Sequence, residues 1–130
     1  MPGAIHHVAL TVTDLDRAIA FYTQTLGFSL GRWLRGPGGD TQIVFVDTPG
    51  GRVELFHYNE GAVVAPARTD NRTTGFNHLA FAVADIDAEV ARLKAAGVAF
   101  TVEPAPRGTS PLRVAFFHDP DGNTLELFED

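Results

Sequence analysis

Two histidines and two glutamates recur at matched places in the chain and could together bind a metal ion. His7 is followed 47 residues later by Glu54, and His78 is followed 48 residues later by Glu126. These residues would supply two neutral ring nitrogens and two carboxylates, which suit a divalent first-row metal and leave room for water or substrate. We therefore predict a divalent metal site. The sequence does not specify the ion among Ni, Zn, Co, Mn and Fe.

Strand alternation is expected to place the four side chains on one kind of face. His7 precedes the apolar Val8, and Glu54 stands between Val53 and Leu55, so each lies opposite its aliphatic neighbours. A carboxylate buried on such a face needs a partner, because an unpaired buried charge is costly. The alternative interpretation is that the histidines are ordinary interior residues and the glutamates bond to neighbouring strands. One histidine and one glutamate per half favour the metal.

The chain contains two similar halves. His7–Asp16 matches His78–Asp87, with the same seven-residue step from histidine to aspartate, and Arg52–Phe56 matches Thr124–Phe128. Matches at both ends with nearly equal spacing indicate a repeated structural module. We therefore expect one domain over residues 1–130, with module one at about 1–60, a linker at about 60–75 and module two at about 76–130.

Each half is predicted to contain a strand, a helix and about three further strands. Val8, Leu10 and Val12 alternate along the first strand. Apolar residues at helical spacing predict helices over Leu15–Leu26 and Ile86–Ala96, each followed by a glycine, and Thr13 or Asp14 is expected to cap the first. Apolar runs between turn residues predict the other strands: 28–34, 42–46, 52–56, 99–102, 112–117 and 123–128.

Composition excludes several classes of function. The 130 residues include no cysteine, so disulfides, thiolate nucleophiles and iron–sulfur clusters are excluded. The net charge is −6 and the ten Lys and Arg residues are scattered, which argues against nucleic acid as a partner. No apolar run approaches the roughly 18 residues of a membrane span, and no targeting segment is evident. We expect a cytoplasmic protein that binds neither nucleic acid nor membranes.

Several segments match those of one known superfamily: His7–Asp16, Phe21-Tyr22, Leu26-Gly27-Phe28, Val53-Glu54-Leu55, His78–Asp87 and Asp119–Leu127. Over nearly its whole length the sequence resembles the vicinal oxygen chelate superfamily, which includes glyoxalase I, methylmalonyl-CoA epimerase, extradiol dioxygenases and fosfomycin and bleomycin resistance proteins. The resemblance implies an α+β fold in which two tandem βαβββ modules form a curved, barrel-like metal-binding cleft. It puts His7, Glu54, His78 and Glu126 at the ligand positions, and it implies a homodimer.

Within the superfamily, the presence of both glutamates favours an enzyme similar to glyoxalase I. The resemblance then implies lyase or isomerase chemistry on a small-molecule substrate with adjacent oxygens. The metal would assist proton transfer next to a chelated carbonyl, and Glu54 or Glu126 would act as the base. Glutathione-using relatives commonly carry an arginine where this chain has Thr11, which favours another substrate.

Three alternatives stay open. An epimerase similar to methylmalonyl-CoA epimerase would use the same metal-assisted proton transfer next to a carbonyl. An Fe(II) dioxygenase of the extradiol type would use His7, His78 and Glu126 and leave Glu54 without a role. A drug-binding protein similar to the bleomycin resistance proteins would need no metal, but such proteins usually lack the full ligand set.

Four other polar residues are weaker candidates. His6 is expected to point to the face opposite His7. His57 and His118 lie near strand ends and are either hydrogen-bond donors behind the site or solvent-facing residues. Arg107 precedes a strand in a loop, where it is either a clamp for an anionic substrate or a solvated side chain.

Overall fold

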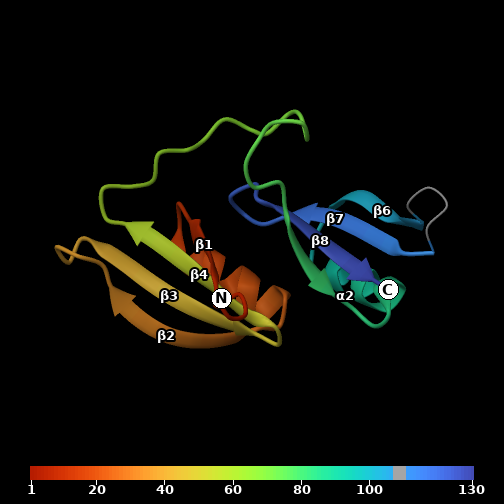
Figure 1. The fold of residues 1–130 in the computed structure, drawn as a ribbon, viewed down its shortest axis with the longest axis horizontal. Helices are drawn as coiled ribbons and strands as arrows, with labels where there is room; N and C mark the ends of the chain where they lie inside the picture. The colour runs from red at the N-terminus through yellow and green to blue at the C-terminus, as the bar shows by residue number, and fades with distance from the viewer. Residues whose placement is uncertain (107–110) are drawn as a thin grey trace. The chain divides into compact units, whose positions relative to one another are not determined.

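The computed structural model describes residues 1–106 and 111–130. The chain divides into two compact units, Met1–Ala65 and Pro66–Asp130, and each unit contains one four-stranded sheet (Figure 1). The border between the units falls inside the segment expected to be a linker, which forms no helix or strand between β4 and β5.

The first unit runs through β1 (Val8–Thr11), α1 (Leu15–Ala20), η1 (Phe21–Thr25), β2 (Ser29–Arg35), β3 (Thr41–Thr48) and β4 (Gly51–Tyr58). The strands lie in the order β1-β4-β3-β2. β1 pairs in parallel with β4, and the other neighbours are antiparallel.

The second unit repeats this plan with β5 (Leu79–Ala82), α2 (Ile86–Ala95), β6 (Phe100–Pro106), β7 (Arg113–His118) and β8 (Thr124–Glu129). Its strand order is β5-β8-β7-β6, with β5 parallel to β8. The predicted α+β class and the two βαβββ modules are confirmed. Each module is an open sheet and not a closed barrel.

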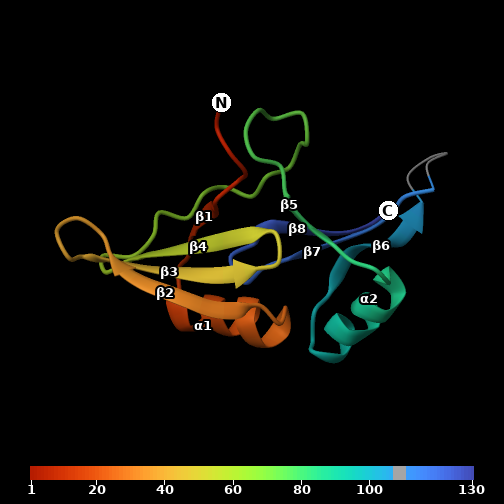
Figure 2. The same ribbon diagram turned by 60° about the horizontal axis from the view of Figure 1, so that its bottom comes forward.

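Each helix covers one face of its own sheet (Figure 2). The apolar stripes predicted from the sequence face inward, so Leu15, Ala18 and Tyr22 are buried in the first unit. Ile86, Val90 and Leu93 are buried in the second. Burial of the leucine, isoleucine and valine side chains among them contributes roughly 1.5–3 kcal/mol each, and it leaves the opposite face of each sheet for polar residues.

The two helices begin and end alike. The Asp14 side chain accepts a hydrogen bond from the Arg17 amide at 3.0 Å, and the Asp85 side chain accepts one from the Ala88 amide at 3.0 Å. Asp14 is therefore the cap, in preference to Thr13. Each helix is followed by a glycine with positive φ, +86° at Gly27 and +90° at Gly97, a conformation that side chains disfavour.

The helical segments differ in their internal winding. The first continues from α1 into the π-helical turn η1, where the Leu26 amide bonds to the Phe21 carbonyl five residues earlier at 2.9 Å. The second is α-helical throughout Ile86–Ala95. The predicted positions of both helices are confirmed, and the π turn is a feature that apolar spacing did not indicate.

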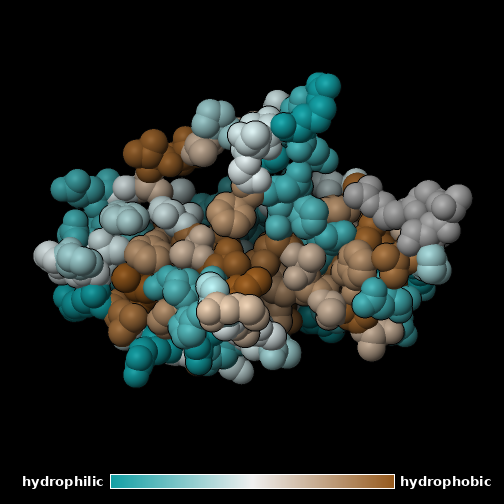
Figure 3. All heavy atoms as spheres, viewed as in Figure 1, coloured by the Kyte–Doolittle hydropathy of each residue, from teal (hydrophilic) through white to brown (hydrophobic). Residues whose placement is uncertain are grey.

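Some apolar surface remains exposed. Leu30, Trp33 and Leu34 on the edge strand β2 are each more than a third exposed, and Figure 3 shows hydrophobic side chains at the surface of the viewed face. Among the described residues, no helix is long and apolar enough to cross a membrane.

Candidate metal and active site

The first histidine–glutamate pair joins the start of β1 to the middle of β4. His7 directly precedes β1, and Glu54 lies opposite Ala9 in the parallel ladder of β1 and β4. His7 Nε2 is 3.0 Å from Glu54 Oε2. Glu54 is only 7% exposed, and strand alternation places it on the face opposite the buried Val53 and Leu55.

The second pair repeats this geometry in the other unit. His78 directly precedes β5, and Glu126 lies opposite Ala80 in the parallel ladder of β5 and β8. His78 Nε2 is 2.7 Å from Glu126 Oε2, and Glu126 is 5% exposed. The structure therefore brings the four predicted residues together as two pairs, one within each unit.

A hydrogen-bonded turn precedes β8, the strand that carries Glu126. Asp119 is buried and accepts hydrogen bonds from the amides of Asp121 and Asn123 at 3.0 and 2.9 Å. The Asn123 side chain donates to Asp119 at 2.8 Å. Within the matched segment Asp119–Leu127, the polar residues thus close a turn, and Glu126 follows it on β8.

An aromatic ring meets each histidine at an equivalent position. Phe45 on β3 pairs with Glu54, and its ring lies 5.6 Å from that of His7 in an edge-on arrangement. Phe116 on β7 pairs with Glu126 in the same register, and its ring lies 5.3 Å from that of His78. These rings limit how the imidazoles can turn.

The other ring nitrogens of the two histidines have different partners. His7 Nδ1 is 2.8 Å from His6 Nδ1, and His6 Nε2 is 3.0 Å from Arg52 Nη1. His78 Nδ1 is 2.8 Å from Asn77 Oδ1. The expectation that His6 points away from His7 is wrong, because β1 begins only at Val8 and its alternation does not extend back to His6.

Asn77, Arg52 and Asp47 are functional candidates that the sequence analysis missed. Asn77 precedes His78 as His6 precedes His7, so extending the repeat by one residue would have found it. Arg52 was included only as the start of a matched segment. Asp47 faces it across the β3–β4 ladder and accepts a hydrogen bond from Arg52 Nε at 2.9 Å.

The donor set fits a divalent cation. In the part of the chain that the structure describes, neither Glu54 nor Glu126 has a hydrogen-bond donor besides its histidine. Two buried carboxylates that each face an imidazole nitrogen are the kinds of ligand that first-row metals take. No three His, Cys, Asp or Glu side chains form a potential metal-binding group among the described residues, and each unit by itself presents one histidine and one glutamate.

A cavity lies beside the histidine of each unit, lined by His78 itself in the second unit and by His6 and Phe45, which contact His7, in the first. In the second unit it has a volume of about 360 Å³ and is lined by uncharged polar and apolar residues and two histidines, including Asn71, His78, Thr101, Phe116 and His118. In the first unit it has a volume of about 380 Å³ and is lined by His6, Arg32, Phe45, Asp47 and Arg52. The two cavities therefore differ in the charge of the residues that line them.

The remaining histidines and Arg107 have separate outcomes. His118 lines the cavity beside His78, which is compatible with a role near the site. His57 is partly buried, and its Nδ1 has no hydrogen-bond partner among the described residues. Arg107 lies outside the described residues.

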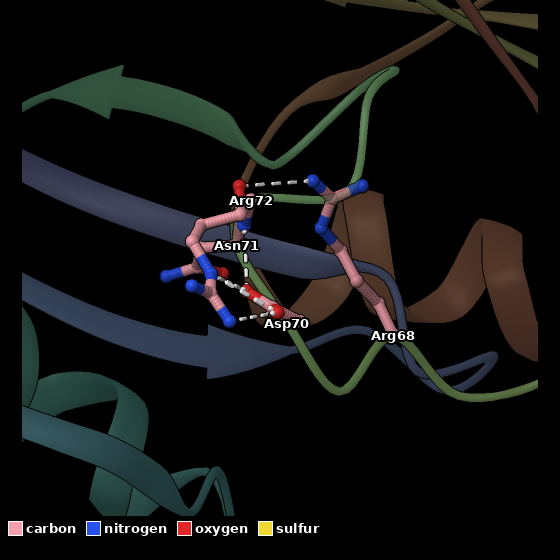
Figure 4. Close-up of polar contacts among 4 residues, drawn as sticks. All are labelled: Arg68, Asp70, Asn71 and Arg72. Atoms are coloured by element: carbon pink, nitrogen blue, oxygen red, sulfur yellow. Dashed lines mark hydrogen bonds and ion pairs between the residues drawn. The ribbon is translucent and has the colours of Figure 1, made fainter.

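The segment before β5 is held in place by an arginine. Arg68 donates to the backbone carbonyls of Asn71, Thr73 and Phe76, and Figure 4 shows it reaching toward the turn that contains Asp70 and Arg72. Asn71 from this turn lines the cavity beside His78. This part of the predicted linker therefore helps to form the wall of the second unit's cavity.

Asp70 and Arg72 close the same turn. Asp70 accepts hydrogen bonds from the Arg72 amide at 2.8 Å and from its Nη2 at 3.0 Å (Figure 4). These bonds from Arg72 lower the pKa of the Asp70 carboxyl, so Asp70 stays ionised in the turn.

The protein consists of two tandem βαβββ modules, each with a histidine before its first strand and a glutamate on its last strand. The chain belongs to the Glyoxalase/Bleomycin resistance protein/Dioxygenase superfamily, whose family model matches residues 4–127. Membership confirms the resemblance found from the sequence.

Similar proteins include enzymes of two named activities. An ethylmalonyl-CoA/methylmalonyl-CoA epimerase from Cereibacter sphaeroides is 34% identical, over 95% of this chain and 93% of the relative. A probable lactoylglutathione lyase from Vibrio cholerae is 37% identical, over 97% and 90%. The crystal structure of glyoxalase I from Zea mays matches with a TM-score of 0.81 and 29% identity, covering 98% of this chain and 44% of that one.

Proposed function

We propose that the protein is a metal-dependent enzyme that moves a proton on the carbon next to a carbonyl, in the manner of glyoxalase I. The observation that carries the proposal is the pair of register-equivalent contacts, His7 with Glu54 and His78 with Glu126. One divalent ion, held by all four side chains, is the proposed cofactor.

When bound, a divalent ion would polarise the substrate carbonyl and stabilise the negative charge that develops as the neighbouring proton leaves. The chain's own residues supply the rest. His7 and His78 hold the ion as neutral donors, and the aromatic rings of Phe45 and Phe116 limit their movement.

Glu54 or Glu126 is the proposed base. Each carboxylate is buried on the polar face of its sheet, where it is protected from competing water, and each has one imidazole partner. A carboxylate that leaves the ion could accept the proton from carbon and return it to the adjacent carbon. Alternatively, one carboxylate would accept the proton from one face of the carbon while the other, already protonated, would deliver a proton to the opposite face. The first outcome is an isomerisation, and the second is an epimerisation.

Epimerisation is the second candidate function. It is supported by the 34% identity to the Cereibacter epimerase over nearly the full length of both chains. The lactoylglutathione lyase relative supports the first candidate to a similar degree. Both reactions need the same metal and the same two carboxylates, so the substrate decides between them.

The equivalence of the two carboxylates argues against the dioxygenase alternative. An Fe(II) site with two histidines and one carboxylate would leave Glu54 unused, yet Glu54 is buried and lies 3.0 Å from its histidine, at the position equivalent to that of Glu126. A metal-free drug-binding protein would have no use for either buried carboxylate.

The test begins with the metal content of protein purified without chelator or nickel affinity resin. Reconstitution across Ni, Zn, Co, Mn and Fe would be followed by incubation with hemithioacetals and 2-methyl acyl thioesters in deuterium oxide. Deuterium incorporation detected by mass spectrometry, dependent on a metal but not on oxygen, is expected. Oxygen-dependent cleavage of catechols would instead assign the protein to the dioxygenases.

We also propose that the protein is a homodimer, as is implied by its resemblance to the superfamily. Light scattering after size-exclusion chromatography is expected to give twice the 14.0 kDa chain mass. A mass equal to one chain would contradict this part of the proposal.

A further inference from the structure

We propose that the residue before each ligand histidine determines how readily that histidine binds the ion. Asn77 prepares His78 for the metal, whereas His6, fixed by Arg52, opposes metal binding at His7. This inference rests on the metal function proposed above. It concerns which ring nitrogen of each neutral histidine carries the hydrogen atom, since only the bare nitrogen can donate to a metal.

In the second unit the hydrogen is directed away from the metal side. The Asn77 side-chain oxygen can only accept, and it lies 2.8 Å from His78 Nδ1. The hydrogen of a neutral His78 is therefore on Nδ1, and its Nε2 keeps a lone pair. That lone pair faces Glu126 Oε2 at 2.7 Å. Two acceptors this close need a cation or a proton between them, as a metal site would provide.

In the first unit the hydrogen bonds run in the opposite sense. A guanidinium can only donate, so Arg52 Nη1 makes His6 Nε2 an acceptor at 3.0 Å. A neutral His6 then carries its hydrogen on Nδ1 and donates it to His7 Nδ1 at 2.8 Å. His7 must in turn carry its own hydrogen on Nε2, which points at Glu54 Oε2 at 3.0 Å. The nitrogen that a metal needs is occupied.

Metal binding at His7 therefore requires a rearrangement that His78 does not need. The hydrogen of His7 has to move from Nε2 to Nδ1, after which His6 Nδ1 must accept it. The hydrogen of His6 would then lie on Nε2, facing the Arg52 guanidinium, and the hydrogen bond between His6 and Arg52 is lost. The free energy of that bond is subtracted from metal affinity.

Arg52 is held in place by more than His6. Its Nε donates to Asp47 Oδ1 at 2.9 Å, and its guanidinium carbon lies 6.0 Å from the centre of the Phe45 ring. The register positions that correspond to Asp47 and Arg52 in the second unit hold His118 and Thr124. No arginine stands behind His78 at that position, so the opposing hydrogen-bond chain is specific to the first unit.

The first test measures Co²⁺ affinity of the metal-free full chain, by calorimetry and by the visible absorption of the ion. His6→Asn gives His7 the kind of neighbour that His78 has, with no change in formal charge, and is expected to tighten Co²⁺ binding about tenfold. Asn77→Ala is expected to weaken it about tenfold, within the range for partners that orient metal ligands.

A charge control separates hydrogen bonding from electrostatics. Arg52→Met is expected to tighten Co²⁺ binding more than Arg32→Met, because both remove a positive charge from the same cavity but only Arg52 contacts His6. Equal effects of the two substitutions would overturn the role given to Arg52.

The second test needs no metal. Nitrogen-15 chemical shifts of the histidine rings, recorded in alkaline solution where the imidazoles are neutral, are expected to place the hydrogen on Nε2 of His7 and on Nδ1 of His78 in the wild-type protein. They are expected to show it moving to Nδ1 of His7 in His6→Asn. The same hydrogen position in both wild-type histidines would overturn the inference.

The two proposals fail in different ways. Co²⁺ binding by the wild type that His6→Asn leaves unchanged or weakens would overturn the inference alone. Absence of Co²⁺ binding by the wild type would overturn the proposed function.

Discussion

The two units carry the same pair of side chains among different neighbours. In both, a histidine before the first strand meets a glutamate on the last strand, with a phenylalanine from the neighbouring strand against the imidazole. The cavity beside His7 is lined by two arginines and an aspartate, whereas the cavity beside His78 has no Asp, Glu, Lys or Arg among its described lining residues.

This difference separates what a repeated module must keep from what it can change. The register of the parallel strands sets the distance between histidine and glutamate, so any copy that folds retains the pair. Residues such as Arg52 and Thr124 occupy one register position on the strand without affecting that distance. The two units therefore share the geometry of the histidine–glutamate pair, while the charge of the residues that surround the pair differs.

The largest effect is expected from the carboxylates. Glu54→Gln and Glu126→Gln should each reduce metal-dependent deuterium exchange by about 10²–10⁴-fold if the residue is the base, the range for general base catalysis. The comparison of the two rates shows which unit supplies the base. The exposed Glu60→Gln is the matched control. Undiminished exchange in both variants would reject the glutamates as bases.

The second-largest effect is expected from replacing one of the two histidines that are proposed to bind the metal. His78→Ala is expected to weaken metal binding by more than about 100-fold, beyond the range for residues behind the ligands. His7→Ala should weaken metal binding less, because the hydrogen-bond chain from Arg52 through His6 already lowers the contribution of His7 to metal binding in the wild type. The measurement is metal occupancy after dialysis. His118 lines the cavity beside His78, and the control variant His118→Ala should retain the metal. Equal metal occupancy in all three variants would contradict the proposal that His7 and His78 are metal ligands.

The helix caps should differ by a smaller amount. Asp14→Ala is expected to lower the free energy of unfolding by about 1 kcal/mol. Asp85→Ala should cost less, because Glu129 also accepts a hydrogen bond at the start of α2, from the Ile86 amide at 2.7 Å. Urea denaturation followed by circular dichroism measures both. A larger loss for Asp85→Ala would show that Glu129 does not support the helix start.

The smallest effect concerns an ion pair with no counterpart in the first unit. Hydrogen bonds from Arg113, at 2.7 and 2.9 Å, lower the pKa of Asp87 below its ordinary value of 3.8. The ion pair therefore stabilises the folded protein fully at pH values above 3.8. This contribution is lost as the pH falls through the lower pKa that Asp87 has in the folded state.

Thermal unfolding at several pH values tests this pair. Asp87→Asn should lower Tm slightly at pH 6 and not at pH 2, since the exposed pair is screened by solvent. Asp16→Asn is the matched control, because Asp16 occupies the equivalent position and has no ion-pair partner among the described residues. A difference that persists unchanged at pH 2 would contradict the ionic origin.

The repeat allowed much of the fold, and the equivalent positions of the histidine and the glutamate in the two units, to be predicted. Alternation placed Glu54 and Glu126 on the correct faces because both lie inside regular strands. It failed for His6, because that residue precedes β1 and its direction is set by contacts with His7 and Arg52. Side-chain partners that come from other strands, such as Asp47 for Arg52, leave no periodic signal in the sequence.

The π turn of the first unit accounts for a difference in length between the two helical segments. From capping aspartate to terminal glycine, the segment Asp14–Gly27 is one residue longer than Asp85–Gly97. A π turn takes up one more residue than an α turn, so the surplus is absorbed within Phe21–Thr25. Gly27 still ends its helix as Gly97 does. The extra residue is thus accommodated inside the helix, and the strands that carry the histidine–glutamate pairs keep equivalent registers in the two units.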